Sequence, residues 1–237
     1  MGQYYYPIVM NREGGTVIGS FYSHSYDHNG LKLMEHSYLG NGFVNAVLAK
    51  AMAAKEFTLA WIGDYSDIDE DIRMSGRYSG DGRDYERIFL RAKRAADNGV
   101  RRIEPDDPEV LEFQDKVSDI VVYDLIRKEK ISLRRYKAAQ IRNRIKLNIS
   151  PWGEGPETLI IHPIPLLTAI GNGKGGGDYA DEGSACMEWV SLWALHPLMI
   201  LTEGDPDPEG EWKDISEEVL FEEGRDLPAA RIMNHTI

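Results

Sequence analysis

Two pairs of short β-prone runs constrain the fold of this chain more than any other feature. Residues 4–9 and 16–18 are rich in tyrosine, isoleucine and valine, and they flank the turn-forming pair Gly14-Gly15. Residues 119–126 alternate in hydrophobicity and are joined by a charged turn to a second apolar run at 131–133. Two β-prone runs around a short turn predict a hairpin. The chain therefore needs a mixed or antiparallel sheet.

Helical segments are expected between and around these hairpins. Asn41 can cap a helix over residues 43–54, whose apolar side chains fall on one stripe. Asp84 can cap a second helix that stops at Gly99, and Pro108 suits the first turn of a third. The sequence therefore predicts an α+β protein with inserted helices.

The two halves of the chain look alike. After its hairpin, each half has a leucine-containing segment that ends in Gly-Asn-Gly, at residues 40–42 and 171–173. Strands are expected at residues 57–62 and 158–162, and each half is expected to finish on a strand containing tryptophan, around Trp61 and Trp193. This pattern predicts two similar β-β-loop-α/β halves and raises the hypothesis of an internal duplication.

Length and composition favour one compact unit over residues 1–237. The chain has 237 residues, of which 42% are hydrophobic and 28% charged, so it can bury a sizeable core. Within that unit we expect four parts: an N-terminal half (1–71), a loop and helical insert (72–116), a C-terminal half with a glycine-rich loop (117–202) and an acidic tail (203–237).

Hydropathy, cysteine content and net charge disfavour several classes of protein. No apolar run approaches the roughly 18 residues of a membrane span, and the first residues lack the pattern of a signal peptide. The single cysteine, Cys186, makes no internal disulfide, so a cytoplasmic location is expected. A net charge of −12 argues against a general nucleic-acid binder.

Charge is unevenly distributed. Residues 127–146 hold nine basic side chains and one acidic one, whereas residues 203–226 hold eleven acids and two bases. The basic strip consists of Arg127, Lys128, Lys130, Arg134, Arg135, Lys137, Arg142, Arg144 and Lys146. Three interpretations remain open: charged faces that complement each other in the fold, a phosphate- or nucleic-acid-binding strip, or an acidic surface that occupies a basic partner's site.

A glycine-rich loop is the strongest candidate for ligand binding. It consists of Gly171, Asn172, Gly173, Lys174, Gly175, Gly176 and Gly177. Glycines free backbone N–H groups to face an anion, and Lys174 adds positive charge. Pro163 and Pro165 interrupt the approach that a dinucleotide-binding loop needs, and Asp178 would repel a phosphate. The alternative is a loop with a structural role.

Histidines and carboxylates give weaker candidates for chemistry. His36 and His162 lie near the two Gly-Asn-Gly motifs, where either could act as a general base, and Asp178 could serve as an acid/base or metal-binding residue. Paired histidines at 24 and 28 and the carboxylates of residues 64–71 leave a divalent metal open as a minor alternative. We assign no metal site and no cofactor.

Four blocks of the sequence carry a resemblance to known proteins. They are Met-Gly-Gln-Tyr-Tyr at residues 1–5, Gly-Leu-Lys-Leu-Met-Glu-His-Ser at 30–37, Trp-Ile-Gly-Asp-Tyr at 61–65, and His-Pro-Ile-Pro-Leu-Leu-Thr-Ala-Ile-Gly-Asn-Gly-Lys-Gly-Gly-Gly-Asp-Tyr at 162–179. Together these blocks resemble an uncharacterised family of bacterial and phage proteins. The resemblance implies a phage or mobile-element setting and transfers no catalytic residue.

Three functions are carried forward. The leading hypothesis is a binding or interaction protein that engages a protein or a small anionic ligand without turnover. An enzyme acting on a nucleotide or other phosphate through residues 171–177 is the first alternative, and it predicts that both Gly-Asn-Gly motifs converge on one pocket. A nucleic-acid binder that uses residues 127–146 is the second. A homodimer is also left open.

Overall fold

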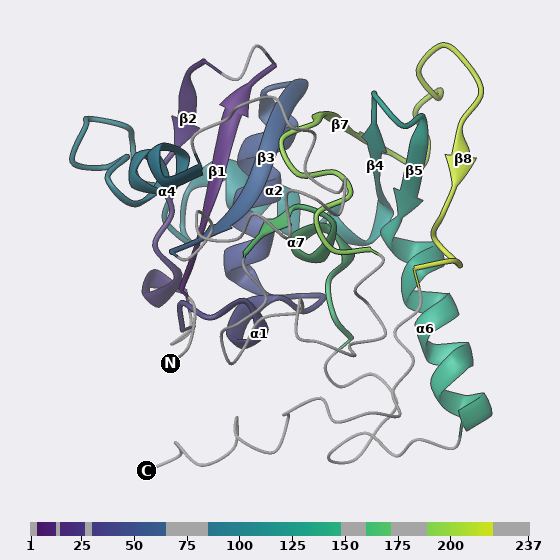
Figure 1. The fold of residues 1–237 in the computed structure, drawn as a ribbon. Coiled ribbons are helices and arrows are strands. Elements are labelled where there is room, and N and C mark those ends of the chain that lie inside the picture. Colours follow the sequence, from purple (N-terminus) through teal and green to yellow (C-terminus); the bar gives the residue numbers. More distant parts are fainter. Residues whose placement is uncertain are drawn as a thin grey trace.

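A mixed, mostly antiparallel sheet organises the fold (Figure 1). The computed structural model describes residues 4–12, 15–26, 30–64, 85–147, 160–171 and 189–219. Within them the strands are β1 (Tyr5–Asn11), β2 (Val17–Gly19), β3 (Glu56–Gly63), β4 (Ile120–Asp124), β5 (Glu129–Ser132), β6 (Ala169–Ile170), β7 (Pro197–Thr202) and β8 (Lys213–Asp214). Their order is β2-β1-β3-β7-β4-β5-β8, and β6 pairs with β3. Only the β3–β6 and β5–β8 pairs are parallel.

A hairpin flanks each of the two central strands, β3 and β7. On one side the hairpin β1–β2 joins β3, with Ile8 opposite Ala60, and on the other the hairpin β4–β5 joins β7, with Val122 opposite Ile200. Both predicted hairpins and the α+β class are therefore confirmed. Strand β8 extends one side of the sheet and β6 pairs with β3 alone, so the likeness of the two halves and an internal duplication stay predictions.

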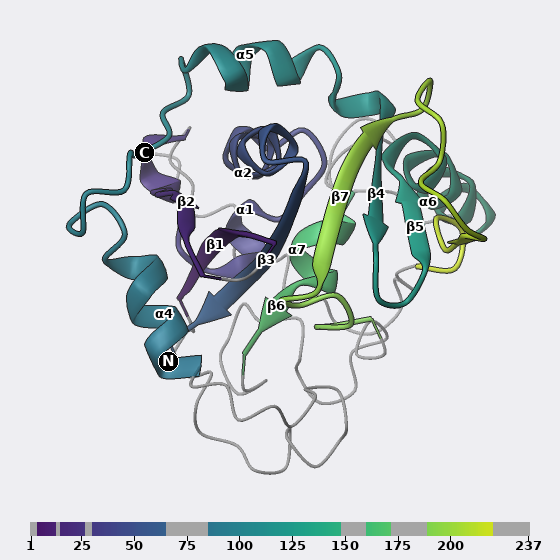
Figure 2. The ribbon, with the colours of Figure 1, turned by 90° about the horizontal axis from the view of Figure 1, so that it is seen from above.

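The helices cover both faces of the sheet. They are α1 (Leu33–His36), α2 (Gly42–Ala53), α4 (Tyr85–Lys93), α5 (Pro108–Gln114), α6 (Leu133–Leu147) and α7 (Pro163–Leu167), with short 3-10 turns η1 (Ser23–Ser25) and η2 (Val117–Asp119). Figure 2 shows α2 and α5 over one face of the sheet and α4 on the other. The predicted start of α5 at Pro108 is confirmed.

Strict alternation along β3 explains this layering. Phe57, Leu59 and Trp61 point into the larger core, which also contains α2, α5 and α7. Ala60 and Ile62 point into a smaller core on the opposite face, which α4 closes with its apolar residues. Successive side chains of a strand point to opposite faces, so a strand that is buried along its whole length needs helices on both sides.

Two of the expected strands are not present as predicted. Ile161 makes only an isolated bridge to Tyr38, and His162 is already the N-cap of α7, because proline suits the first turn of a helix. Residues 158–159 lie outside the described residues. Trp193 lies in a turn, and the strand that follows it, β7, contains no tryptophan.

Most of the basic strip forms helix α6, although no helix was expected there from the sequence. Only a few side chains of this helix, such as Leu133, Tyr136 and Ala139, are buried, and charged residues separate them. Its sequence therefore resembles a charged surface segment more than a core-facing helix. Among the described residues, no helix is long and apolar enough to cross a membrane.

Candidate functional site

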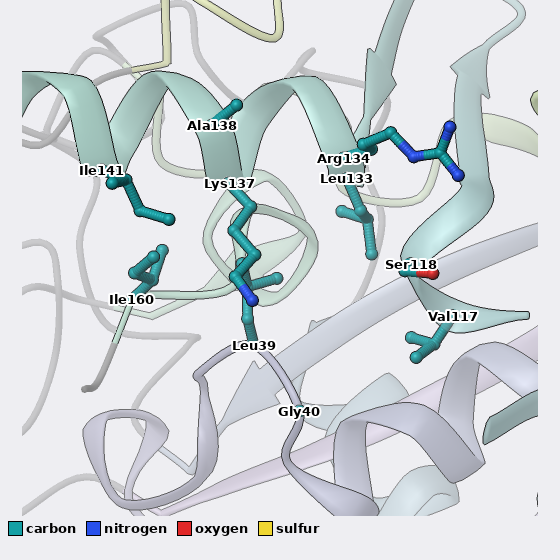
Figure 3. Close-up of a pocket in the computed structure, with 10 residues that line it drawn as sticks. All are labelled: Leu39, Gly40, Val117, Ser118, Leu133, Arg134, Lys137, Ala138, Ile141 and Ile160. Carbon is teal, nitrogen blue, oxygen red and sulfur yellow. The ribbon is translucent and has the colours of Figure 1, made fainter. Parts of the chain in front are cut away.

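A cavity of about 360 Å³ lies where α6, η2 and the turn before α2 meet (Figure 3). Its lining is mostly apolar and comes from four separate parts of the chain. The lining residues are Leu39, Gly40, Val117, Ser118, Leu133, Arg134, Lys137, Ala138, Ile141 and Ile160. The described residues of this lining include no histidine and no carboxylate.

The first Gly-Asn-Gly motif shapes one wall of the cavity. Asn41 caps α2 by accepting hydrogen bonds from the backbone N–H groups of Phe43 (3.0 Å) and Val44 (3.3 Å). Gly40 has a φ of +86°, a conformation that favours glycine, and no atom lies within 4 Å of where its Cβ would be. The turn therefore leaves the wall open at Gly40.

Helix α6 forms the opposite wall. Its buried Tyr136 donates a hydrogen bond to the carbonyl of Ile161 (2.8 Å), which holds the helix against the segment that contains Ile160. Figure 3 shows Lys137 extending from α6 toward Leu39, across the space between the apolar side chains. The site thus combines an apolar interior with an ammonium group over it.

The second cation of the lining is already committed to carboxylates. Arg134 forms an ion pair with Asp119 and another with Glu203, the latter at 2.9 Å. Arg134 therefore has less charge to offer a bound anion.

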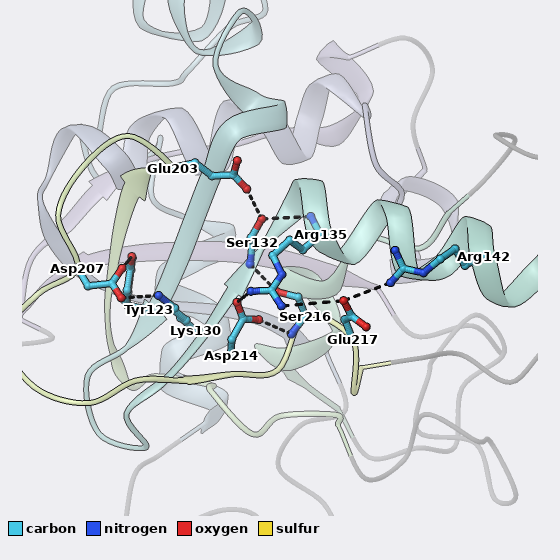
Figure 4. A network of polar contacts seen from close by, with 10 residues as sticks. All are labelled: Tyr123, Lys130, Ser132, Arg135, Arg142, Glu203, Asp207, Asp214, Ser216 and Glu217. Carbon is cyan, nitrogen blue, oxygen red and sulfur yellow. Dashed lines mark hydrogen bonds and ion pairs between the residues drawn. The ribbon is translucent and has the colours of Figure 1, made fainter.

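Most of the remaining basic strip faces the acidic segment 203–219 (Figure 4). Lys130 pairs with Asp207, Arg135 with Asp214 (2.6 Å), and Arg142 with Glu217 (3.2 Å). Closer by in sequence, Arg127 pairs with Glu129 (2.8 Å), and the Lys128 ammonium lies 4.6 Å from the centre of the Trp212 ring. The side chains of Arg144 and Lys146 lie outside the described ones.

This network agrees with the first of the three interpretations of the charge pattern, in which the two charged segments complement each other. Backbone pairing reinforces it, because β8 adds to the edge of β5, and the Ser216 hydroxyl accepts a hydrogen bond from the Ser132 N–H (2.9 Å). Each cation that is engaged by a carboxylate has less charge to offer a phosphate.

The two candidate histidines lie on facing segments and are fully buried. The backbone N–H of His162 donates to the carbonyl of Ser37 (2.9 Å), next to His36. His36 Nε2 accepts a hydrogen bond from Trp61 Nε1 (3.2 Å), and its Nδ1 faces the Gly30 carbonyl (3.2 Å). His162 Nδ1 accepts from the Ile164 N–H, and its Nε2 has no partner within the described segments.

Burial sets the protonation of both histidines. It lowers the pKa of His36 to about 4, against the opposing effect of the Gly30 carbonyl, and lowers the pKa of His162 to about 3. Both imidazoles are neutral at pH 7, and neither reaches solvent. A general-base role for either one has no geometric support here.

The glycine-rich loop is described only at its start. Gly171 is buried at the end of β6 and does not line the cavity. The other predicted site residues of this region lie outside the described residues: Asn172, Gly173, Lys174, Gly175, Gly176, Gly177 and Asp178. Within the described ranges, no three histidine, cysteine or acidic side chains come together in a way that could hold a metal ion.

Sequence reasoning missed the apolar lining of the cavity. Leu39, Val117, Ile141 and Ile160 are single hydrophobic residues in four segments, and nothing in their local sequence distinguishes them from core residues. Comparison of the chain with protein-family models, curated proteins and solved structures finds no match. The resemblance to a bacterial and phage family therefore stays a prediction.

Proposed function

We propose that this protein binds a small amphipathic anion without chemical turnover. The apolar body of the ligand would occupy the cavity between α6 and the turn at Gly40, and its charged group would lie beside Lys137. The observation that carries this proposal is the combination of an apolar lining with a lysine ammonium extended across it (Figure 3).

Size and chemistry both support a ligand of this kind. A volume of about 360 Å³ is within the range of small-molecule sites in proteins. Burial of apolar ligand surface supplies the main favourable free energy, at roughly 25 cal/mol per Å². A carboxylate, sulfonate or phosphate group would lie beside the Lys137 ammonium, which extends across the cavity.

The alternative functions have less support in the described geometry. Among the described residues, the lining contains no histidine or carboxylate, which weakens the case for turnover of a phosphate substrate. No described residue of the second Gly-Asn-Gly motif lines the cavity. Five cations of the basic strip already pair with carboxylates, which weakens the nucleic-acid hypothesis. A bacterial or phage origin remains part of the proposal and rests on the resemblance alone.

Two fluorescent dyes of matched shape test the proposal. Anilinonaphthalene sulfonate carries a negative charge, whereas phenylnaphthylamine has nearly the same apolar body and no charge. We expect both to bind the protein with a saturable rise in fluorescence. Lys137→Gln should lower the affinity for the sulfonate dye by about threefold, which is the effect expected from the loss of a partly exposed ion pair. The affinity for the neutral dye should not change.

A second variant tests the location of binding. Ile141→Trp places a larger side chain in the cavity and should lower the affinity for both dyes by about tenfold. Lys93→Gln, which removes an exposed charge from α4 on the other face of the sheet, serves as the control and should change neither affinity. Unchanged binding of both dyes to a folded Ile141→Trp protein would refute the assignment of this cavity.

A further inference from the structure

The lining of the cavity beside α6 follows a regular order. Leu133, Lys137 and Ile141 follow one another at intervals of four residues along the helix, and all three line the cavity. Side chains four residues apart lie on the same face of a helix, one turn after another. The α6 wall of the cavity therefore extends over two helical turns, with an aliphatic residue at each end and a lysine in the middle.

The opposite wall has an aliphatic residue at each end as well. Figure 3 shows Val117 at the end of the view where Leu133 lies. It shows Ile160 close to Ile141 at the other end, and Lys137 between the two ends. The positive charge therefore lies near the middle of an apolar lining.

The polar groups at the Leu133 end already have partners. The Ser118 hydroxyl donates a hydrogen bond to Asp119 Oδ1 (2.9 Å), and Arg134 pairs with the same carboxylate and with Glu203. Groups that are engaged in this way have less to offer a ligand. What this end offers is chiefly the apolar surface of its leucine and valine.

The helix rise sets the length of ligand that each end can take. A helix rises about 1.5 Å per residue, so Lys137 lies roughly 6 Å along the axis from Leu133 and roughly 6 Å from Ile141. An extended chain advances about 1.2 Å per bond, because the three backbone bonds of a residue span at most about 3.6 Å. An aliphatic arm of about four carbons therefore matches each end.

We propose that the ligand of this cavity is an α-branched aliphatic carboxylate, in which two apolar arms flank a central anionic group. This inference rests on the proposed function, and it adds the shape of the ligand and the position of its charge. One arm contacts Leu133 and Val117, and the other contacts Ile141 and Ile160. The carboxylate lies beside the Lys137 ammonium. A straight-chain carboxylate has its charge at one terminus, so with its head in this place it fills one end only.

Two isomers test this inference on the wild-type protein. 2-Butylhexanoate and decanoate have the same formula and charge, and they differ only in where the carboxylate is attached. Each is titrated against protein that has bound the neutral dye phenylnaphthylamine. We expect 2-butylhexanoate to displace the dye at about tenfold lower concentration, which corresponds to roughly two more methylene groups buried.

Variants at the two ends test whether both arms are bound. Val117→Ala and Ile141→Ala each remove apolar surface from one end, and each should lower the affinity for 2-butylhexanoate by about threefold. Decanoate should lose affinity in only one of them. Leu111→Ala, at an exposed position of α5 outside the cavity, is the matched control and should change neither affinity.

The outcomes separate this inference from the proposed function. If wild-type protein shows no saturable binding of phenylnaphthylamine, both are overturned. If the dye binds but neither isomer displaces it, or decanoate binds as tightly as 2-butylhexanoate, this inference alone is overturned. A loss of affinity for 2-butylhexanoate in only one of the two folded end variants would overturn the central position of the charge. The isomer comparison needs no variant, so it decides the question even where an alanine variant fails to fold.

Discussion

His36 and His162 are two residues whose burial makes stability depend on pH. Each side chain is fully buried, and each stays neutral because the charged form would be desolvated. Their folded-state pKa values, about 4 and about 3, are below the ordinary value of 6.5. The unfolded chain therefore binds more protons than the folded one between pH 6.5 and these values, and stability is lost as the pH falls.

We expect the free energy of unfolding to fall by roughly 2–4 kcal/mol between pH 7 and pH 5. His162→Asn should remove about half of this dependence, because asparagine keeps the cap on α7 and does not titrate. Urea unfolding at both pH values is the measurement, with His24→Gln as an exposed control. A wild-type stability that does not change over this range would contradict the neutral assignment of both histidines.

At the scale of elements, α2 shows how a short motif starts a helix and shapes a site at once. Asn41 satisfies two N–H groups of the first turn, and the glycine before it turns the chain with a positive φ. Helix α6 depends on different contacts. Leu133, Tyr136 and Ala139 face inward. Its arginines at 134, 135 and 142 pair with acids far away in sequence.

Asn41→Ala should destabilise the protein by about 1 kcal/mol, because two N–H groups at the start of α2 lose their acceptor in a buried setting. Asn41→Asp restores an acceptor of the same size and should recover most of the loss. Thermal unfolding of the three proteins measures both effects. An alanine variant as stable as wild type would show that the cap contributes nothing to α2.

At the scale of the whole molecule, the distribution of charge matters more than its sum. The chain carries −12 overall, yet nine of its 27 basic residues lie within residues 127–146, and segment 203–219 lies against several of them (Figure 4). Lys130, Arg135 and Arg142 each meet a carboxylate of that segment. The acidic segment therefore acts as an internal counter-charge for the strip.

We expect wild-type protein not to bind a labelled oligothymidine in 0.1 M salt. The double variant Asp207→Asn and Glu217→Gln releases Lys130 and Arg142, and it should gain weak binding that falls steeply with added salt. Glu112→Gln with Asp106→Asn changes the net charge equally on another surface and should gain nothing. Fluorescence anisotropy measures all three, and tight salt-sensitive binding by the wild type would instead favour the nucleic-acid hypothesis.

Much of the fold was predictable because it is encoded locally. The hairpins, the capped helix α2, strand β3 and the start of α5 each depend on neighbouring residues, through alternation, turn composition or capping. The predicted strand was wrong at residues 160–162, because prolines 163 and 165 favour the first turn of a helix. Helix α6 was missed because its inward residues are few and lie among charges.

The sequence by itself determined the α+β class, the two hairpins and the clustering of opposite charges in separate segments. The tertiary structure alone decided which charges pair, since Arg134 and Glu203 lie far apart in the chain. It also decided where the cavity lies and which residues line it. Local preferences act over a few residues, whereas a cavity or a side-chain pair depends on long-range packing that brings distant segments together.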